Sequence, residues 1–295
     1  MLIRIARRNE TFDATQVFED LPLARLCQMI QRRVMRPGKQ HPASCADQSK
    51  VVLDIEMDVL FFLRMRTKFI RAFYEDACFP FSERKRKIEA GEDPFEPPYS
   101  EDDVPPFLDE WMEADESIDV LGQMCISMLS SSLELYLRES VNKLLARYSN
   151  ESLTKAGIGR PERKKARKQG WINAYREYFR DQLAIDWTKA ESNLSLLEEI
   201  VLTRNRAQHP ENVTSLHIEQ SYRDATKYPR SFFADELEMK LFGGDQAQDE
   251  RVHPWRLNVS KARLLAAVDE VERFCSWLDG VLRKWPGARM RVTSR

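Results

Sequence analysis

The chain has 295 residues, of which 42% are hydrophobic and 32% charged, with 46 Lys and Arg against 47 Asp and Glu and a formal net charge of −1. This length is sufficient for one large domain or two smaller ones, each with its own core. The balanced charge excludes an overall electrostatic attraction to nucleic acid, so any such affinity must be local. With only ten glycines and no repeated runs of Val, Ile and Thr, the chain is predicted to be all-α.

The cysteines indicate a reducing compartment. They are odd in number, scattered and without metal-ligand spacing, so we expect free thiols in a cytoplasmic protein. The five are Cys27, Cys45, Cys78, Cys125 and Cys275. His41 and Cys45 are too few ligands for a metal site, so no metal or cofactor is expected. The sequence MLIRIARRNETF lacks the apolar core of a signal peptide, and apolar runs such as 59–63 fall far short of the ~20 residues of a membrane span.

The first 105 residues are predicted to form an N-terminal helical region. Helical spacing runs over about 14–35 and is ended by Pro37-Gly38, and because Pro22 interrupts the pattern the first helix is predicted to begin near Leu21. A second helix is predicted over 51–77. The second helix carries apolar residues on more than one face, and its phenylalanines are expected to lie in the core. The basic cluster Ser82 to Lys87 and the Pro-rich, acidic residues 91–106 predict a loop that separates this region from the next domain.

Residues 106–285 are predicted to form a second helical domain, followed by a basic tail over 286–295. A long amphipathic helix from Trp111 to Tyr148 is expected to be its spine, and the small residues Ser130 to Ser132 would let another helix approach closely. A short helix is predicted around residues 232–241 and a last helix over 260–282. His217 has no evident partner in the sequence.

A basic segment is predicted to begin the helix that contains Trp171, because Pro161 suits a first turn. It holds six basic residues and one acid: Arg160, Arg163, Lys164, Lys165, Arg167 and Lys168, with Glu162. Cations at a helix N-terminus oppose the helix dipole, so the cluster calls for an explanation. Contact with RNA phosphates is one, and a basic loop or a contact for an acidic partner protein is another. The aromatic residues that follow on the same helix are expected to lie mostly in the core, although Trp171 at its edge could reach a base.

The stretch Ser195 to Glu211 is where the sequence points to chemistry. Thr188 to Glu191 has the form of a capping box and predicts a helix start. Apolar residues then recur at three-and-four spacing, but the next position of that stripe is Arg204. An arginine is rarely buried without a partner, so this position predicts a wet cleft, an interface or an anionic partner.

Asn205 and His209 are four residues apart, so they share one helix face beside Arg204. Pro210 predicts that His209 lies at the helix end with its ring partly free. A permanent cation, an amide and an imidazole suit the handling of a phosphodiester without a metal. The alternative is that basic and polar residues merely close a helix against its dipole and that His209-Pro210 is a stop signal.

Arg204-Asn205-x-x-x-His209 resembles the Arg-x(4 to 6)-His motif of the HEPN (higher eukaryotes and prokaryotes nucleotide-binding) superfamily. Ser132 to Glu139 resembles part of the helix that packs beside that motif, and the resemblance covers about residues 112–285. It implies an antiparallel helical bundle that acts as a metal-independent endoribonuclease, in which two motifs face each other across a homodimer. A prokaryotic toxin or antiviral defence effector, with an antitoxin protein as partner, is implied in the same way.

By this resemblance, His209 is the acid or base that acts at the ribose 2′-hydroxyl, and the product is a cyclic phosphate. Arg204 would stabilise charge on the phosphate, and Asn205 would orient the phosphate or the imidazole. Arg206 inside the motif departs from the family pattern and could compete with Arg204. Glu134 is a possible hydrogen-bond partner for Arg204.

Two other functions stay open from the sequence. One is a catalytically inactive HEPN-like binding or assembly protein, which a buried or ion-paired site would favour. The other is a nucleotide-binding partner of a nucleotidyltransferase, which would use the same residues.

Overall fold

The structure is a computed structural model that describes residues 58–97, 105–147, 170–209, 216–242 and 254–285. These residues form seven α-helices, one 3-10 turn and one sheet of two short strands. The all-α prediction is therefore confirmed. The helix predicted over residues 14–35 and the predicted tail over 286–295 lie outside the described residues.

Helix α3 (Val59–Ala90) buries one face. Asp58 caps its start by accepting a hydrogen bond from the N–H of Phe61 (3.0 Å), and Gly91 ends it with a positive φ of 62°. The buried residues recur at three-and-four spacing: Leu60, Leu63, Thr67, Ile70, Tyr74 and Cys78. The prediction that the phenylalanines lie in the core is wrong for Phe61, Phe62 and Phe69, which are exposed because they fall off this stripe.

The loop predicted at Ser82 to Lys87 is also wrong, because α3 continues as a helix to Ala90. Pro80 does not end the helix, although it removes one backbone hydrogen bond. The basic residues are held by acids of the next helix: Lys85 pairs with Asp115 (2.5 Å) and Arg84 with Glu113 (3.2 Å). These ion pairs and the shared core keep the end of α3 alongside its neighbour.

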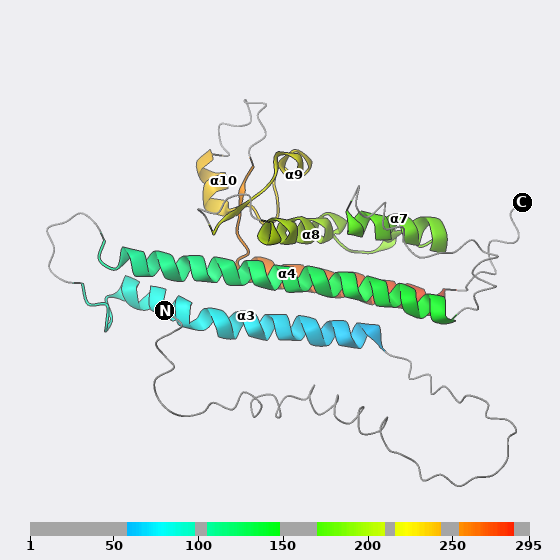
Figure 1. Cartoon of the computed structure of the whole chain (residues 1–295), viewed down its shortest axis with the longest axis horizontal. Coiled ribbons are helices and arrows are strands. Elements are labelled where there is room, and N and C mark those ends of the chain that lie inside the picture. Colours follow the sequence, from blue (N-terminus) through cyan, green and yellow to red (C-terminus); the bar gives the residue numbers. More distant parts are fainter. Residues whose placement is uncertain (1–57, 98–104, 148–169, 210–215, 243–253, 286–295) are drawn as a thin grey trace, which may run out of the picture. The chain divides into compact units, whose positions relative to one another are not determined.

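Helix α4 (Leu108–Arg147) is the spine of the bundle, as predicted. Helices α3, α8 and α11 all pack against it, and α3 and α8 run in the opposite direction (Figure 1). Fully buried apolar side chains line its length: Cys125, Ile126, Leu129, Leu133 and Leu137. Ser130 and Ser132 are buried, and the Ser132 hydroxyl accepts a hydrogen bond from Arg66 Nε of α3 (2.9 Å). The boundary predicted at residue 105 therefore falls between two helices that share one core.

Helices α7 (Trp171–Leu183) and α11 (Lys261–Lys284) contribute aromatic residues to the same core. Trp187, in the 3-10 turn η1 (Trp187–Lys189), is fully buried between Phe179 and Phe274, with ring centroids 5.7 and 4.6 Å apart. Aromatic side chains bury large apolar areas, so this cluster fixes α7 and the turn against α11.

A small sheet and two short helices, of which only α10 was predicted, lie on the same side of α4 as α8 (Figure 1). Strand β1 (Ile218–Glu219) pairs antiparallel with β2 (Arg256–Leu257), with Ile218 opposite Leu257. Helix α9 (Tyr222–Lys227) lies in a stretch predicted only as mixed and polar, and α10 (Glu236–Phe242) matches the short helix expected near residues 232–241. Trp255 is buried and donates a hydrogen bond to the Pro229 carbonyl (2.8 Å), holding the chain before α11.

Among the described residues, the stretch Leu108–Ala146 is long and apolar enough to cross a membrane by length and composition, although no such span was expected. Packing explains its hydropathy, because this is the core helix and 56% of the most apolar window is buried in the fold. Cys78, Cys125 and Cys275 are free thiols, as expected, and are buried. Burial raises the pKa of all three, that of Cys125 to about 12, so they are unreactive at neutral pH.

Candidate functional site

Helix α8 (Leu194–Gln208) carries the predicted site, and it begins later than the capping box predicts. Thr188 lies in the 3-10 turn η1, which is capped by Asp186, and the N-cap of α8 is Asn193, whose side chain accepts from the N–H of Leu196 (3.1 Å). Tertiary contacts explain this later start of α8. Burial of Trp187 fixes the 3-10 turn, and Glu270 of α11 accepts a hydrogen bond from the Asn193 backbone N–H (2.6 Å).

Arg204, Asn205 and His209 lie together at the C-terminal end of α8. The Arg204 guanidinium donates to Asn205 Oδ1 (2.9 Å), and both side chains are half-buried. This is the only hydrogen bond that the Arg204 side chain makes within the described residues, so its remaining donors are uncommitted there. The bond also orients the guanidinium with respect to the helix.

His209 is the C-cap residue of α8, as Pro210 predicts. Its backbone N–H donates to the Asn205 carbonyl (3.0 Å), and its φ of −131° is already outside the helical range. The side chain is exposed, and the imidazole makes no hydrogen bond with a described residue. The prediction of a helix-end histidine with a partly free ring is confirmed.

Arg206, the second arginine of the motif, is committed to another contact. It pairs with Asp224 of α9 at 3.4 Å, and the two side chains are only 22% and 16% exposed. Both line a cavity of about 10 Å³ between α8, α9 and β2, which is roughly the space of one water. Little space is therefore left between α8 and α9 beside this ion pair. Glu134, considered as a partner for Arg204, makes no hydrogen bond with it.

Two adjacent glutamates of α8 hold the segment that contains α9. Buried Glu199 accepts from the Ser231 hydroxyl (2.6 Å) and the Phe232 N–H (2.8 Å), and burial raises the pKa of its carboxyl. Glu198 accepts from Lys227, from the Tyr228 hydroxyl (2.8 Å) and from Asn173 (3.2 Å). Burial would raise the pKa of Glu198, but these hydrogen bonds outweigh it, so the pKa is lowered and the carboxylate stays ionised.

The other predicted site residues lie outside the described structure. These are Arg160, Arg163, Lys164, Lys165, Arg167 and Lys168. Trp171, which follows them, is half-buried at the start of α7.

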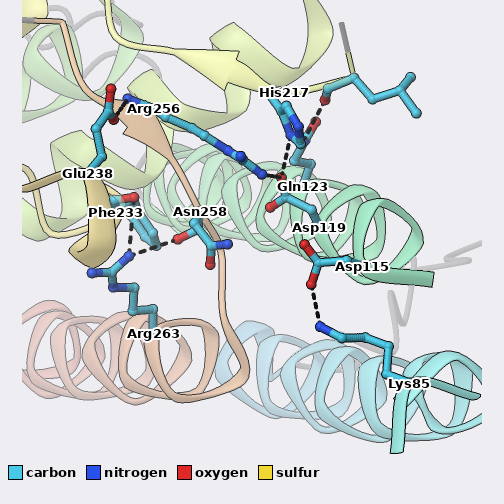
Figure 2. Close-up of polar contacts among 11 residues, drawn as sticks. Lys85, Asp115, Asp119, Gln123, His217, Phe233, Glu238, Arg256, Asn258 and Arg263 are labelled. Carbon is cyan, nitrogen blue, oxygen red and sulfur yellow. Dashed lines mark hydrogen bonds and ion pairs between the residues drawn. The ribbon is translucent and has the colours of Figure 1, made fainter. Parts of the chain in front are cut away.

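A buried charge cluster at the same end of the bundle was not predicted from the sequence (Figure 2). The side chain of Asp119 on α4 is only 4% exposed. One of its carboxylate oxygens lies 3.3 Å from His217 Nδ1 and 3.4 Å from Arg256 Nη2. Burial raises the pKa of Asp119, and the contacts with His217 and Arg256 offset part of that rise. These residues are far apart in sequence, and no local pattern brings them together.

The cluster fixes the chain where it returns to the bundle after α8. Gln123 of α4 donates to the Leu216 carbonyl (3.1 Å), next to His217, and β2 supplies Arg256 (Figure 2). The backbone N–H of Arg256 donates a hydrogen bond to the Glu238 carboxylate of α10 (2.6 Å). The segment that carries α9 is thus tied to α4 at its start and to α8 along its length.

A cavity of about 540 Å³ lies between α3, α4 and the start of α11. Tyr74, Cys78, Asp119 and Ser260 are among its lining residues. Two further acids on its walls are paired with lysines, Asp115 with Lys85 and Glu75 with Lys261. In the described part of the chain, no group of three or more His, Cys, Asp or Glu side chains is placed to hold a metal ion.

Comparison of the chain with models of protein families, with characterised proteins and with solved structures finds no match.

Proposed function

We propose that the protein is a metal-independent endoribonuclease whose site comprises Arg204, Asn205 and His209. The observation that supports the proposal is that the two arginines of the motif make different contacts. Arg206 is held by Asp224, whereas Arg204 bonds only to Asn205 among the described residues and retains donors for an anion. An exposed imidazole lies one helical turn beyond Asn205.

These groups suit attack by the ribose 2′-hydroxyl on the adjacent phosphorus. A neutral His209 accepts the hydroxyl proton, the 2′-oxygen bonds to phosphorus, and the bond to the 5′-oxygen breaks. The Arg204 guanidinium offers paired N–H donors to the phosphate oxygens as negative charge develops, and Asn205 fixes its orientation. The products are a 2′,3′-cyclic phosphate and a 5′-hydroxyl.

The departing 5′-oxygen needs a proton from a second acid. Two copies of the motif commonly face each other across a dimer in the HEPN superfamily, so the proposal includes a homodimer in which the second His209 of the cleft supplies this proton. A cytoplasmic toxin or antiviral defence effector, restrained by an antitoxin protein, is the role that the resemblance implies. The segment of residues 160–168 is proposed as an additional RNA contact.

Cleavage of total cellular RNA in EDTA tests the proposal. The purified protein is compared with His209→Ala and Arg204→Ala, and with two controls, Gln208→Ala beside the site and Arg180→Ala on α7, both exposed. We expect cleavage with cyclic-phosphate ends in the parent and both controls, and a loss of at least about 100-fold in the two site variants. Equal cleavage by the site variants would exclude this site.

A second candidate, a catalytically inactive binding or assembly protein, is favoured by one observation. Phe69 of α3 is 59% exposed and stacks on Phe73 with ring centroids 5.8 Å apart, and an exposed aromatic pair is a feature of interaction sites. A parent protein that leaves RNA intact in EDTA would support this second function.

A further inference from the structure

Among the described residues, the exposed phenylalanines all lie on α3. They are Phe61, Phe62, Phe69 and Phe79, which are 50%, 39%, 59% and 68% exposed. At about 100° per residue they fall within an arc of about 100°, opposite the buried stripe of the helix. Helices α4 and α11 pack on the buried side. In Figure 1, α3 forms one edge of the described bundle, with α4 between it and α8.

The apolar side chains at the start of this arc form a continuous surface. We call it the α3 outer face, and it comprises Phe61, Phe62, Met65, Phe69 and Phe73. Phe61 and Phe62 are in edge contact with ring centroids 5.5 Å apart, and Phe69 stacks on Phe73. Met65 is half-buried and lies one helical turn from both Phe61 and Phe69. Exposed Asp58 and Asp76 bound the face at its two ends, so Phe79 lies outside it.

Three cations flank the α3 outer face. On the α11 side, Arg64 donates a hydrogen bond to the Ser276 hydroxyl (3.3 Å), and on the α4 side, Arg66 donates to the Ser132 hydroxyl (2.9 Å). Lys68 is exposed one turn beyond Arg64 on the same side. None of these three cations forms an ion pair with a described residue. The aromatic surface thus has unpaired positive charge along both of its long edges.

The acids beside this part of α3 are held by other cations. Between Val59 and Tyr74, α3 itself contains no acid. The acids of its surroundings are paired with two arginines: Arg283 with Asp58 (3.6 Å) and Asp279 (2.6 Å), and Arg71 with Asp269 (2.6 Å) and Glu272 (4.0 Å). The net charge of the surface is therefore small, but its three flanking cations have no acid of their own.

The shape of the α3 outer face favours a lipid surface over a peptide. A helical peptide is bound in a groove, whereas this face is a ridge on a single helix and lines neither of the cavities between the helices. Helices that lie on anionic bilayers present aromatic side chains to the boundary of headgroups and acyl chains, with Lys and Arg extending to the phosphates. The 12 residues from Phe61 to Phe73 span about 18 Å, so several rings reach a bilayer that lies along α3.

We propose that the α3 outer face binds the anionic surface of a lipid bilayer, with Phe61 and Phe69 inserted beneath the headgroups and Arg64, Arg66 and Lys68 at the lipid phosphates. This inference goes beyond the proposed ribonuclease and does not depend on it. It describes attachment to one leaflet and no crossing of the membrane. The cytoplasmic leaflet, which a protein of the proposed location would meet, carries anionic lipids.

Flotation of the full-length protein with vesicles tests the proposal. One set of vesicles contains equal parts of phosphatidylcholine and phosphatidylserine, and the other contains phosphatidylcholine alone. We expect the parent to float with the anionic vesicles and not with the uncharged ones. Phe61→Ser combined with Phe69→Ser should weaken this binding at least about tenfold, because binding scales with the apolar area that is buried. Lys68→Gln should weaken it about fivefold and reduce its salt dependence.

Leu237→Ser combined with Leu241→Ser on α10 is the matched control, because both leucines are 67% exposed and lie away from α3. This variant should bind like the parent. Phe69→Trp keeps an aromatic ring and should also retain binding. A double Phe→Ser variant that binds like the parent, or a parent that binds both kinds of vesicle equally, would overturn the inference. A parent that binds neither would overturn it as well and would leave the face to a protein partner.

The two proposals fail separately. The α3 outer face is not part of the site proposed on α8, so the double Phe→Ser variant should cleave RNA in EDTA as the parent does. Vesicle binding that depends on the phenylalanines, in a protein that never cleaves RNA, keeps the membrane surface and removes the ribonuclease. Cleavage by a protein that binds no vesicle does the reverse.

Discussion

The Asp224 carboxylate of α9 lies 3.4 Å from the Arg206 guanidinium of α8. This ion pair gives Arg206 a structural role in the contact between the two helices. Sequence spacing alone leaves Arg204 and Arg206 as competitors. The contact assigns Arg206 to the packing of α9 and leaves Arg204 beside Asn205.

Asp224→Asn should lower the free energy of unfolding by about 1 kcal/mol, because the pair is shielded from solvent on both sides. Urea unfolding measures the change, and a double-mutant cycle with Arg206→Gln isolates the pairwise energy. Asp181→Asn is the control, since its pair with Arg180 is well exposed and should contribute little. A coupling energy near zero would show that Asp224 does not hold Arg206.

Asn193→Ala should destabilise the protein by about 1 kcal/mol, because Asn193 is the N-cap of α8. Asn193→Asp preserves the capping acceptor and should restore most of the loss. Thermal unfolding compares them with Glu191→Ala, which removes an exposed residue of the capping box predicted from the sequence. A larger effect of Glu191→Ala would place the start of the helix where the sequence predicts it.

Gly122→Ala should destabilise the protein by about 1–3 kcal/mol or more, despite the better helix propensity of alanine. A Cβ on Gly122 of α4 would lie 2.4 Å from the Val259 carbonyl oxygen, which belongs to the backbone and cannot turn away. Gly280→Ala on α11 is the matched control, because open space surrounds that position. It should stabilise by roughly 0.5–1 kcal/mol in the same urea titration. Equal effects would contradict the close approach of the Val259 backbone to α4.

Asp119 should make stability depend on pH in a defined direction. Burial raises the pKa of Asp119 in the folded protein above its value in the unfolded chain. The folded state therefore holds this proton more tightly, and the stabilisation is complete at low pH and lost as pH rises through the folded-state pKa. The free energy of unfolding of the parent, relative to Asp119→Asn, should therefore fall as the pH rises above about 4, the ordinary pKa of an aspartate.

Urea unfolding at several pH values measures this difference. Asp109→Asn, an exposed aspartate of the same helix, is the matched control. A relative stability of the parent that rises with pH would mean that His217 and Arg256 outweigh the cost of burying the charge.

The parts of the fold with strong periodicity were predictable. The long apolar stripe of α4, the last helix α11 and the position of His209 before Pro210 each follow from local rules. The start of α8 was not predictable, since the burial of Trp187 and the contact with Glu270 override the local capping signal. Likewise, α3 continues through a charged segment because acids of α4 neutralise it.

Some residues of the candidate site were likewise predictable from the sequence, and others were not. Its residues on α8 were named from sequence, because they share one helix end. Asp224 was missed, since a six-residue helix in a polar stretch has too short a pattern to detect. The cluster of Asp119, His217 and Arg256 has no local signal at all, because only the tertiary fold brings its members together.

The central position of α4 has a consequence for synthesis on the ribosome. Of its described packing partners, α3 is made before it, whereas α8 and α11 emerge later. The face of α4 that α8 covers has no native partner until about residue 208 is made, and the face that α11 covers has none until about residue 284. Because α4 is long and apolar, these uncovered faces are the surfaces that expose the nascent chain to aggregation during that interval.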